Sequence, residues 1–493
     1  MKSPRRGRLP PQQKGVKPWF MDEIEMTEIK DDRKDPLAQY DTVAIFGLGR
    51  SGLAAAHLLS QFGKKLIVSD TADASKRAEL EAKLPAGATL ILGHNEIGDA
   101  QVIVTSPGLE PSSAIFEEAH RRGIPVLAEL ELGYLASNLP LVAISGTDGK
   151  TTTTTLTSHI LATCGVRNLM GGNVGIPLCE CLLDTSDAAK DLSCYVVETS
   201  AFQLSFCPHF CAHVFIATNI AEDHAEYFHN DWEQYVSTKR RPLSVMTSED
   251  IAILNASDAY IRTWDKYTSS RCIWYAENRL DLPKEAVDKA WLEADVIHVF
   301  YHSQAYQLPM SSIHLRGKHN AMNVMCAVLA SLCMGCAWAD IVSAIASYTL
   351  PPHRIQTVCE KDGVVFIDDS KATNPHAAIA GLTTVDEPLI LIAGGVDKGL
   401  SLSAWIDLMK KNVRALVLIG ALTERLHAEA VKGGLMCPIE RCQTLEEAVA
   451  RGYVLAKEHG AKAVLLSPAC SSYDMFKSYG QRGDVFAAAA RNL

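Results

Sequence analysis

The stretch LVAISGTDGKTT (Leu141–Thr152) joins an apolar run to a glycine-containing loop and to residues that can open a helix. Its aliphatic first part lacks polar alternation, as expected of a strand that is buried on both faces. The two loop glycines free the backbone, and the N–H groups of a helix start attract phosphate oxygens. Lys150 adds a positive charge, and the Thr151 hydroxyl can ligate Mg²⁺. The stretch therefore predicts a phosphate-binding loop, although Ile144 departs from the usual G-x-x-x-x-G-K-T pattern.

Other short apolar runs lie on both sides of this stretch and end in Gly, Ser, Asp or Asn. Helix-like segments separate them, which is typical of parallel strands covered on both faces. The expected fold class is therefore α/β. The expected strands are Thr42–Gly47, Leu66–Asp70, Val102–Ser106, Leu141–Gly146, Tyr195–Thr199, Val214–Asn219, Val364–Asp368, Leu389–Gly394, Ala415–Gly420 and Ala463–Ser467.

The chain has 493 residues, too many for one hydrophobic core, and its length suggests about three domains. A polar segment at Ala136–Asn138 precedes a new strand, and Pro351 and Pro352 cannot continue the Ala-rich helix expected over Ala321–Ser347. The expected division is a disordered arm (1–40), a Rossmann-like domain (41–138), a P-loop-type ATPase domain (139–350) and a Rossmann-like C-terminal domain (351–493).

Composition and charge narrow the class of protein. The chain is 47% hydrophobic and 21% charged, as in soluble globular proteins, and no apolar run approaches the ~20 residues of a membrane-spanning helix. Its net charge is −10, with six basic and no acidic residues among the first 20, so the acidic remainder would repel a nucleic-acid backbone. Fourteen scattered cysteines suit a reducing cytoplasm. We expect a cytoplasmic, monomeric protein without a membrane or nucleic-acid partner.

Cysteine and histidine alternate over residues 207–213 and would share one face if this segment formed a strand. Consecutive residues of one strand cannot easily surround a tetrahedral zinc ion, so packing is favoured over a metal site. Cys333 and Cys336 lie in an apolar helical segment, where buried thiols are expected.

The segment Gly47–Gly52 is a G-x-G-x-x-G turn between an expected strand and an expected helix, and the next strand ends at Asp70. Such a turn can hold a dinucleotide, with the acid on a ribose. Taken alone it would indicate NAD. The same turn can hold another nucleotide, or can simply permit close packing.

Further polar residues follow expected strand ends. Glu198 would supply an oxygen ligand to Mg²⁺ beside Thr151, and His224 could meet a metal or a phosphate. Two donor-rich turns, Asp368–Asn374 and Leu466–Ser472, could bind an anionic substrate or could cap the helices that follow.

Together these motifs resemble the Mur ligases of peptidoglycan synthesis, over about residues 41–493, and within that family the branch that adds D-glutamate. The motifs Asp369–Asn374 and Ser467–Cys470 look characteristic of that branch. The matching motifs are Ser145–Thr151, Gly171–Pro177, Glu198 with Phe202–Leu204, Thr218–His224, His319 with Asn320, His353 with Arg354, Asp369–Asn374 and Ser467–Cys470.

The resemblance implies an ATP-dependent ligase that joins D-glutamate to UDP-N-acetylmuramoyl-L-alanine through an acyl phosphate. It implies that the first glycine turn holds UDP and not NAD, that two Mg²⁺ ions assist, and that closure of the C-terminal domain completes the site. The alternatives are a Mur ligase that adds another amino acid, a nicotinamide-dependent oxidoreductase, or a nucleotide-regulated binding protein.

The resemblance also implies which residues meet each substrate. For ATP they are Gly146, Thr147, Asp148, Gly149, Lys150, Thr151, Thr152, His319, Asn320, Asn323, Arg354 and Asp369. For the UDP substrate they are Gly47, Gly49, Arg50, Ser51, Asp70, Thr71, Ser106, Pro107, Gly108, Asn173 and His224. Candidates for D-glutamate are Lys371, Thr373, Lys398, Ser472 and Tyr479, since its two carboxylates need cations and donors. The implied catalytic residues are Lys150, Glu198, His224 and Lys239, and the implied metal ligands are Thr151, Glu198, His224 and a carbamylated Lys239.

Some residues depart from the family pattern. Asp148 replaces the more usual Asn and would place a negative charge beside phosphates, which predicts either weaker ATP binding or the recruitment of extra Mg²⁺. Ala201 stands where Ser is common, and Tyr473 and Tyr479 stand where Leu and Phe are familiar. For Lys239, the alternative to carbamylation is a solvated lysine beside Arg240 and Arg241.

Overall fold

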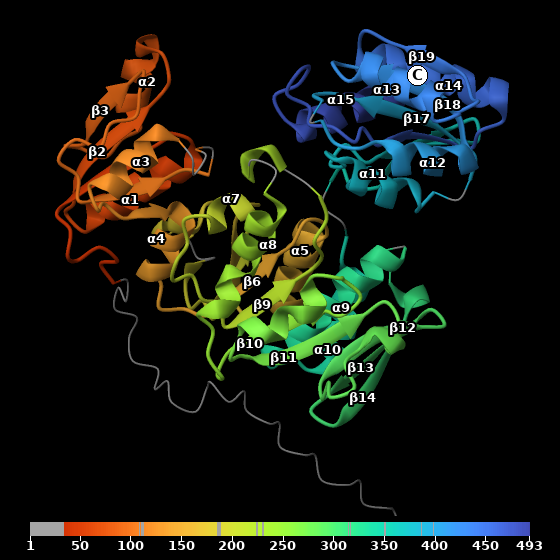
Figure 1. The fold of residues 1–493 in the computed structure, drawn as a ribbon. Helices are drawn as coiled ribbons and strands as arrows, with labels where there is room; N and C mark the ends of the chain where they lie inside the picture. Colours follow the sequence, from red (N-terminus) through yellow and green to blue (C-terminus); the bar gives the residue numbers. More distant parts are fainter. Residues whose placement is uncertain are drawn as a thin grey trace, which may run out of the picture.

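The computed structural model describes residues 34–107, 109, 113–184, 189–222, 225–228, 231–313, 315, 317–349, 352–385, 387–397 and 399–493. These residues form three separate β-sheets, which follow one another along the chain, each with its own helices (Figure 1). The α/β fold class is therefore confirmed. Every expected strand is present, with ends that differ by at most two residues.

The first sheet is parallel and has the order β3-β2-β1-β4-β5. Its strands are β1 (Thr42–Phe46), β2 (Lys65–Asp70), β3 (Thr89–Leu92), β4 (Val102–Thr105) and β5 (Val126–Ala128). Its helices are α1 (Arg50–Gln61), α2 (Arg77–Glu81), α3 (Ala114–Arg121) and α4 (Glu129–Ala136). Val43 and Ile45 pack on one face, while Ala44 and Phe46 pack on the other. Burial on both faces explains why β1 lacks polar alternation.

The central sheet has the order β14-β13-β12-β11-β10-β9-β6-β8-β7. Its strands are β6 (Leu141–Ser145), β7 (Asn168–Gly172), β8 (Cys194–Glu198), β9 (Val214–Ala217), β10 (Ile251–Asn255), β11 (Arg271–Ala276), β12 (Lys289–Glu293), β13 (Val296–Tyr301) and β14 (Gln304–Pro309). Its α-helices are α5 (Lys150–Thr163), α6 (Leu178–Leu183), α7 (Ala201–Leu204), α8 (Trp232–Arg240), α9 (Lys318–Cys333) and α10 (Trp338–Ser347). The phosphate-loop strand β6 lies between β8 and β9, so polar residues that end these three strands meet at one edge.

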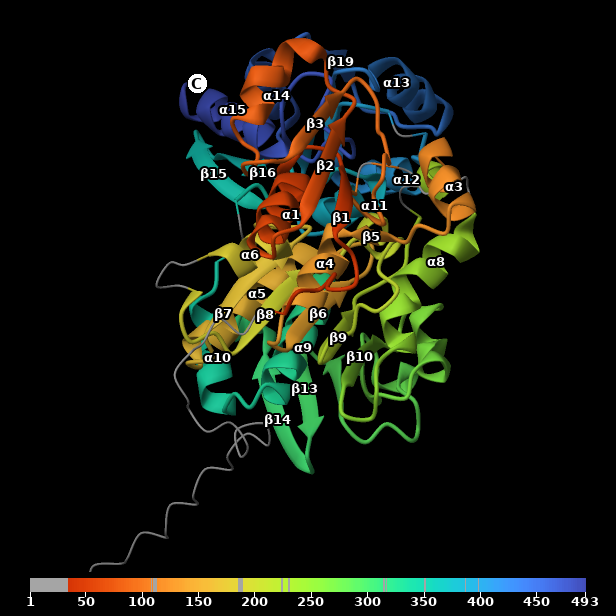
Figure 2. The ribbon, with the colours of Figure 1, turned by 90° about the vertical axis from the view of Figure 1, so that its left-hand side faces the viewer.

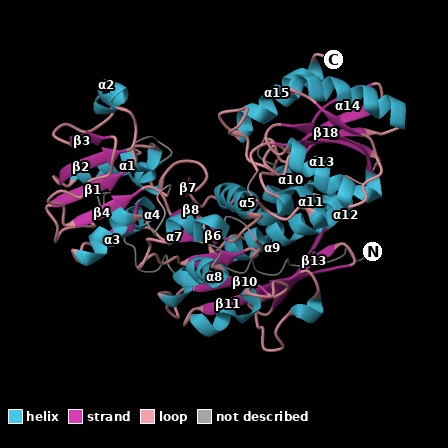
Figure 3. Ribbon diagram, turned by 45° about the horizontal axis from the view of Figure 1, so that its top comes forward, coloured by secondary structure: helices cyan, strands magenta, loops and turns pink. Residues whose placement is uncertain are grey.

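The C-terminal sheet has the order β15-β16-β20-β17-β18-β19 and is parallel except for β15. Its strands are β15 (Gln356–Lys361), β16 (Val364–Asp368), β17 (Leu389–Gly394), β18 (Val413–Ile419), β19 (Ile439–Arg441) and β20 (Ala463–Leu466). Its helices are α11 (Pro375–Leu382), α12 (Ser403–Asn412), α13 (Thr423–Lys432), α14 (Leu445–His459) and α15 (Tyr479–Arg491). Helices α11–α13 cover one face and α14 with α15 the other (Figure 3).

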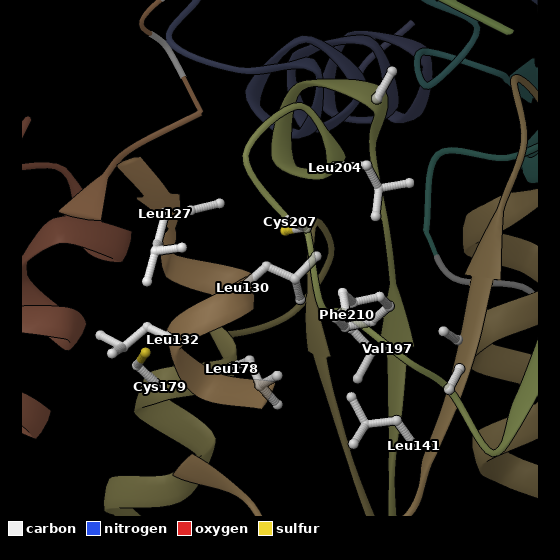
Figure 4. Close-up of a cluster of buried hydrophobic side chains, with 14 of the residues drawn as sticks. Leu127, Leu130, Leu132, Leu141, Leu178, Cys179, Val197, Leu204, Cys207 and Phe210 are labelled. Atoms are coloured by element: carbon white, nitrogen blue, oxygen red, sulfur yellow. The ribbon is translucent and has the colours of Figure 1, made fainter. Parts of the chain in front are cut away.

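The first two sheets share a continuous apolar core. Leu130 and Leu132 of α4 belong to one buried cluster with Leu178 of α6 and with Phe210, which precedes β9 (Figure 4). Helices α1 and α6 also lie side by side (Figure 2). A shared apolar core resists relative motion, so the first two domains are expected to behave as one body.

One expectation about local structure is wrong. The helix expected over Ala321–Ser347 is two helices, because Gly335 adopts a left-handed φ of 82° and ends α9 before α10 begins. The Cys/His segment 207–213 lies in the loop between α7 and β9, so its side chains do not share a strand face. Cys207 and Phe210 are buried there, in agreement with packing.

The packed chain begins before residue 41. Leu37 is buried in the first core, and the Lys64 ammonium donates to the carbonyls of Leu37 and Tyr40 and pairs with Asp35 at 2.8 Å. Residues 1–33 of the expected arm lie outside the described residues. No helix in the described part of the chain is long and apolar enough to cross a membrane.

Two buried carboxyls of α4 give the stability a pH dependence. Glu129 accepts a hydrogen bond from the Cys179 backbone N–H at 2.6 Å, and burial raises its pKa from 4.5 to about 7. Burial raises the pKa of Glu131 to about 7 as well. A carboxyl whose pKa is higher in the folded state stabilises the fold when protonated. This contribution is complete below about pH 4.5 and is lost as the pH rises through about 7.

We therefore expect Glu129→Gln to reduce the loss of stability between pH 5 and pH 8, by up to about 3 kcal/mol. Thermal unfolding midpoints at several pH values would measure it. Glu79→Gln, in α2 and at an exposed ion pair with Lys83, serves as the control. Parallel pH profiles for the wild type and Glu129→Gln would contradict the expectation.

Candidate active site

The loop after β6 is held in a conformation that requires its glycines. Gly146 and Gly149 have φ values of 141° and 78°, which L side chains rarely adopt. A Cβ atom at Gly146 would lie 1.9 Å from Thr218 Oγ1, and one at Gly149 would lie 2.3 Å from Asn323 Oδ1. The Asp148 N–H donates to Asn219 Oδ1 at 3.0 Å. The segment after β9 therefore holds the loop in place. Helix α5 begins at Lys150, directly after the loop.

A cavity of about 450 Å³ opens beside this loop, between the central and C-terminal sheets. It contains eight of the residues implied for ATP: Asp148, Gly149, Thr152, His319, Asn320, Asn323, Arg354 and Asp369. Gly146, Thr147, Lys150 and Thr151 belong to the same loop without lining the cavity. A cavity that combines apolar and polar lining residues and reaches a helix N-terminus suits a nucleoside triphosphate.

Sequence reasoning missed several cavity residues. Asn255 ends β10 and donates to the Thr218 carbonyl at 2.7 Å, and Tyr275 of β11 donates to the Ala217 carbonyl at 2.8 Å. Asn255 could have been found from the sequence, because it is a polar residue directly after the apolar run Ile251–Leu254. No sequence pattern points to Tyr275, since its place in the cavity depends on the pairing of β11 with β10.

Lys371 brings the C-terminal turn into electrostatic contact with the phosphate loop. Its pKa is lowered to about 8, mainly by burial and also by the nearby charges of Arg354 and Lys150, while Glu198 raises it. Groups from three elements are thus close enough to influence one ammonium. Burial also raises the pKa of Asp369 to about 7, although Ser467 donates a hydrogen bond to it at 2.8 Å.

Glu198, at the end of β8, fits a cation site. Its Oε1 accepts a hydrogen bond from Asn173 Nδ2 at 2.7 Å. Its Oε2 is buried and has no hydrogen-bond partner among the residues that the structure describes. A buried carboxylate oxygen without a donor is costly unless a cation or water satisfies it. The donor set of Glu198 and the Thr151 hydroxyl consists of the hard oxygens that Mg²⁺ prefers.

Lys239 lies against the phosphate loop. Its side chain is 3% exposed, it donates to the Gly146 carbonyl, and its Nζ lies 4.8 Å from the centre of the Tyr235 ring. The alternative of a solvated lysine is therefore wrong. Carbamylation stays a prediction.

Asp148 lines the cavity, so its extra charge would face the nucleotide. We expect Asp148→Asn to lower the KM for ATP about fivefold, because removing a charge near a phosphate changes binding by about 1 kcal/mol. Steady-state kinetics at saturating Mg²⁺ would measure it. Asp258→Asn, at another carboxylate that lines the cavity, tests whether any lost carboxylate has this effect. A higher KM in Asp148→Asn would contradict the prediction.

The first glycine turn lies where the strand order of the first sheet reverses. The Leu48 N–H donates to Asp70 Oδ2 at 2.6 Å, and Ser106 Oγ donates to the Gly47 carbonyl at 3.2 Å. Arg50 instead extends to the central domain and pairs with Glu180 at 2.8 Å. Gly49, Ser51, Thr71 and Pro107 lie at the same edge of the sheet, and Asn173 follows β7. Gly108 lies outside the described residues.

The candidates for D-glutamate gather at the carboxyl edge of the C-terminal sheet. Lys371 and Thr373 follow β16, Ser472 follows β20, and Tyr479 opens α15. The Lys371 ammonium lies 3.8 Å from the centre of the Tyr479 ring, whereas Tyr473 is 75% exposed. Lys398 and His224 lie outside the described residues.

Comparison with known proteins assigns all three parts of the chain to one family. Three family models match: "Mur ligase MurD-like, N-terminal domain" at residues 41–128, "Mur ligase middle domain" at 144–331 and "Mur ligase, glutamate ligase domain" at 353–470.

Curated relatives include the UDP-N-acetylmuramoylalanine--D-glutamate ligases of Geotalea daltonii and Desulfosudis oleivorans. Each is 34% identical over 457 residues, which is 92% of this chain and 97% or 96% of the relative.

Solved structures agree in fold. MurF from Acinetobacter baumannii has a TM-score of 0.57 at 18% identity, over 84% of this chain and 88% of that one. MurC from Thermotoga maritima has a TM-score of 0.56 at 14% identity, over 92% and 99%. From the sequence identity and the three matching domain models, the chain belongs to the Mur ligase family, among its UDP-N-acetylmuramoylalanine--D-glutamate ligases.

Proposed function

We propose that this protein joins D-glutamate to UDP-N-acetylmuramoyl-L-alanine at the expense of ATP. The observation that supports it best is the position of Lys371, which lines the cavity beside the phosphate loop and also packs on Tyr479. A residue of the proposed amino-acid site thus reaches the proposed ATP site. Residues 41–138 would hold the UDP portion, residues 139–350 would hold ATP, and residues 351–493 would hold D-glutamate.

The reaction has two steps. An oxygen of the alanyl carboxylate attacks the γ-phosphorus of ATP, and the bond to the bridging oxygen breaks, which gives an acyl phosphate and ADP. The D-glutamate nitrogen then attacks the acyl carbon, a C–N bond forms, the C–O bond to phosphate breaks, and the amine proton passes to solvent. The N-terminus of α5 and the Lys150 ammonium stabilise charge on the phosphates.

The residues present fit Mg²⁺, and two ions are proposed. Thr151, Glu198 and a carbamylated Lys239 would hold them. Bound Mg²⁺ supplies positive charge that offsets the phosphate oxygens. The buried Lys239 could not serve as a ligand in its ammonium form, and carbamylation by CO₂ would convert it into an anionic oxygen donor. The protein is further proposed to act in the cytoplasm as a monomer, without nucleic-acid or membrane partners.

Phosphate release tests the function directly. The protein would be mixed with ATP, Mg²⁺ and UDP-N-acetylmuramoyl-L-alanine, with or without D-glutamate. We expect release that depends on D-glutamate and is not supported by L-alanine, L-lysine or meso-diaminopimelate. Activity with one of the other amino acids would reassign the specificity, and release indifferent to every amino acid would refute the ligase function.

Substrates are also expected to compact the protein. The cavity lies between two sheets whose connection runs through residues 348–356, so a nucleotide that contacts both sides should draw the C-terminal domain inward. Small-angle scattering would detect a smaller radius of gyration with ATP, Mg²⁺ and the UDP substrate than with the UDP substrate alone. Equal radii would argue against closure.

A further inference from the structure

One buried arginine joins the turns that carry the proposed D-glutamate residues. Arg482 lies in the first half of α15 and is 1% exposed. Its Nε donates to Ser370 Oγ at 2.9 Å, and its Nη2 donates to the Ser370 carbonyl at 2.8 Å and to the Cys470 carbonyl at 3.0 Å. Arg482 therefore ties the turn after β16 to the turn after β20.

The turn after β17 packs against the same guanidinium. Gly395 has a φ of 142°, and a Cβ atom there would lie 3.2 Å from Arg482 Nη1 and 2.4 Å from the Ser471 carbonyl oxygen. The Val396 N–H donates to that Ser471 carbonyl at 2.9 Å. Strands β16, β20 and β17 are neighbours in the sheet, so Arg482 sits under three adjacent turns at the carboxyl edge.

The Ser370 hydroxyl connects these turns to the start of α15. Ser370 Oγ accepts from Arg482 and donates to the Tyr479 carbonyl at 2.8 Å. Because the hydroxyl has one proton and the carbonyl can only accept, the direction of both bonds is determined. The next residue, Lys371, places its ammonium 3.8 Å from the centre of the Tyr479 ring. The orientation of Lys371 against Tyr479 thus depends on the contacts of Ser370.

The charge of Arg482 is maintained although it is buried. Its pKa is lowered to about 10 because burial outweighs the opposing effects of Cys470, Asp474, Asp368 and Asp369. The guanidinium is therefore charged at neutral pH. Charged donors make strong hydrogen bonds to carbonyl groups, so removing them would leave the buried Ser370 and Cys470 carbonyls without these donors.

We propose that Arg482 is a positioning residue for the amino-acid substrate. It sets the spacing of Lys371, Ser472 and Tyr479 without lining the nucleotide cavity. This inference rests on the proposed function, since those three residues are the proposed contacts of D-glutamate. Loss of Arg482 should consequently impair the use of D-glutamate and spare the activation of the UDP substrate by ATP.

Arg482→Met and Arg482→Lys in the full chain test the proposal. We expect Arg482→Met to raise the KM for D-glutamate about 10- to 100-fold, and Arg482→Lys, which keeps a cation, to raise it less. The KM for ATP should change much less than the KM for D-glutamate, because Lys371 lines the nucleotide cavity whereas Ser472 and Tyr479 do not. Formation of the acyl phosphate without D-glutamate, trapped with hydroxylamine, should be equally preserved. If Arg482→Met does not fold, the same comparison is made with Arg482→Lys.

A control variant separates positioning from general loosening of α15. Phe486 lies one turn further along the helix, is buried, and packs on Phe366 with ring centres 6.4 Å apart. Phe486→Leu should lower the unfolding temperature without changing the KM for D-glutamate.

Three results would overturn the inference. They are an unchanged KM for D-glutamate in both arginine variants, an equal loss of acyl phosphate formation, or the same kinetic change in Phe486→Leu. Wild-type protein that releases phosphate without regard to D-glutamate overturns the proposed function itself, before any variant is measured.

Discussion

Replacing Lys150 with alanine is expected to lower turnover by about 10³-fold or more. Lys150 is the first residue of α5, and its Nζ donates to the Thr147 carbonyl within the loop at 2.6 Å. Its positive charge lies where the phosphates of ATP would meet the helix N-terminus. The negative charge that develops on the phosphates during phosphoryl transfer is stabilised by a cation that is already in position. Phosphate release and hydroxylamine trapping would both measure the loss, because the first chemical step is the one affected.

Two further variants make the Lys150 result specific. Lys150→Arg retains the charge but not the point geometry of an ammonium, so a partial loss is expected. Lys266→Ala removes an exposed lysine of the same domain and should leave turnover unchanged. Turnover in Lys150→Ala within tenfold of the wild type would show that the loop does not carry the transferred phosphate.

The second large effect is expected at Lys239. Lys239→Ala should lower turnover about 10²-fold or more, with partial recovery on addition of a small carboxylate such as formate. The reason is spatial: Lys239 is 3% exposed and contacts the carbonyl of Gly146, so the deletion leaves space next to the phosphate loop. A carboxylate that enters this space would replace the proposed carbamate oxygens.

Carbamylation can also be observed without activity. Wild-type protein incubated with ¹³C-bicarbonate should show a carbamate resonance that Lys239→Ala lacks. Arg240→Ala is the matched control, since Arg240 is adjacent in α8 but stacks on Tyr267 with 3.6 Å between its guanidinium carbon and the ring centre. Failure of rescue together with an absent resonance would mean that Lys239 acts as an ammonium.

Much of the fold was predictable because the buried strands are short, local and uniformly apolar. The stretch Leu141–Thr152 contains its own strand, turn and helix start, and β16 and β17 match their expected bounds. The antiparallel extension β12–β14 was not among the expected strands. It lies at the edge of the sheet, where β13 alternates between buried and partly exposed residues, so it lacks the uniform apolar signal of the inner strands.

The candidate site was likewise predictable from the sequence only in part. The motifs around Lys150, Glu198 and Lys371 are visible in the sequence because each follows directly from a strand end. That Lys371 lies within electrostatic reach of Lys150 and Glu198 is a property of the packed domains, as is the burial that lowers its pKa. The contribution of Tyr275 to the cavity likewise depends on strand pairing across the sheet.

By itself, the sequence determined the class of chemistry: a glycine loop with Lys150 and Thr151 behind an apolar strand, followed by a carboxylate at the next strand end. These features depend on residues close in the chain, whose backbone freedom and charge follow from their type. Only the tertiary structure decided which distant residues share a site. Arg482, with no motif of its own, acquires its contacts to Ser370 and Cys470 because sheet order places strands β16, β20 and β17 side by side over α15.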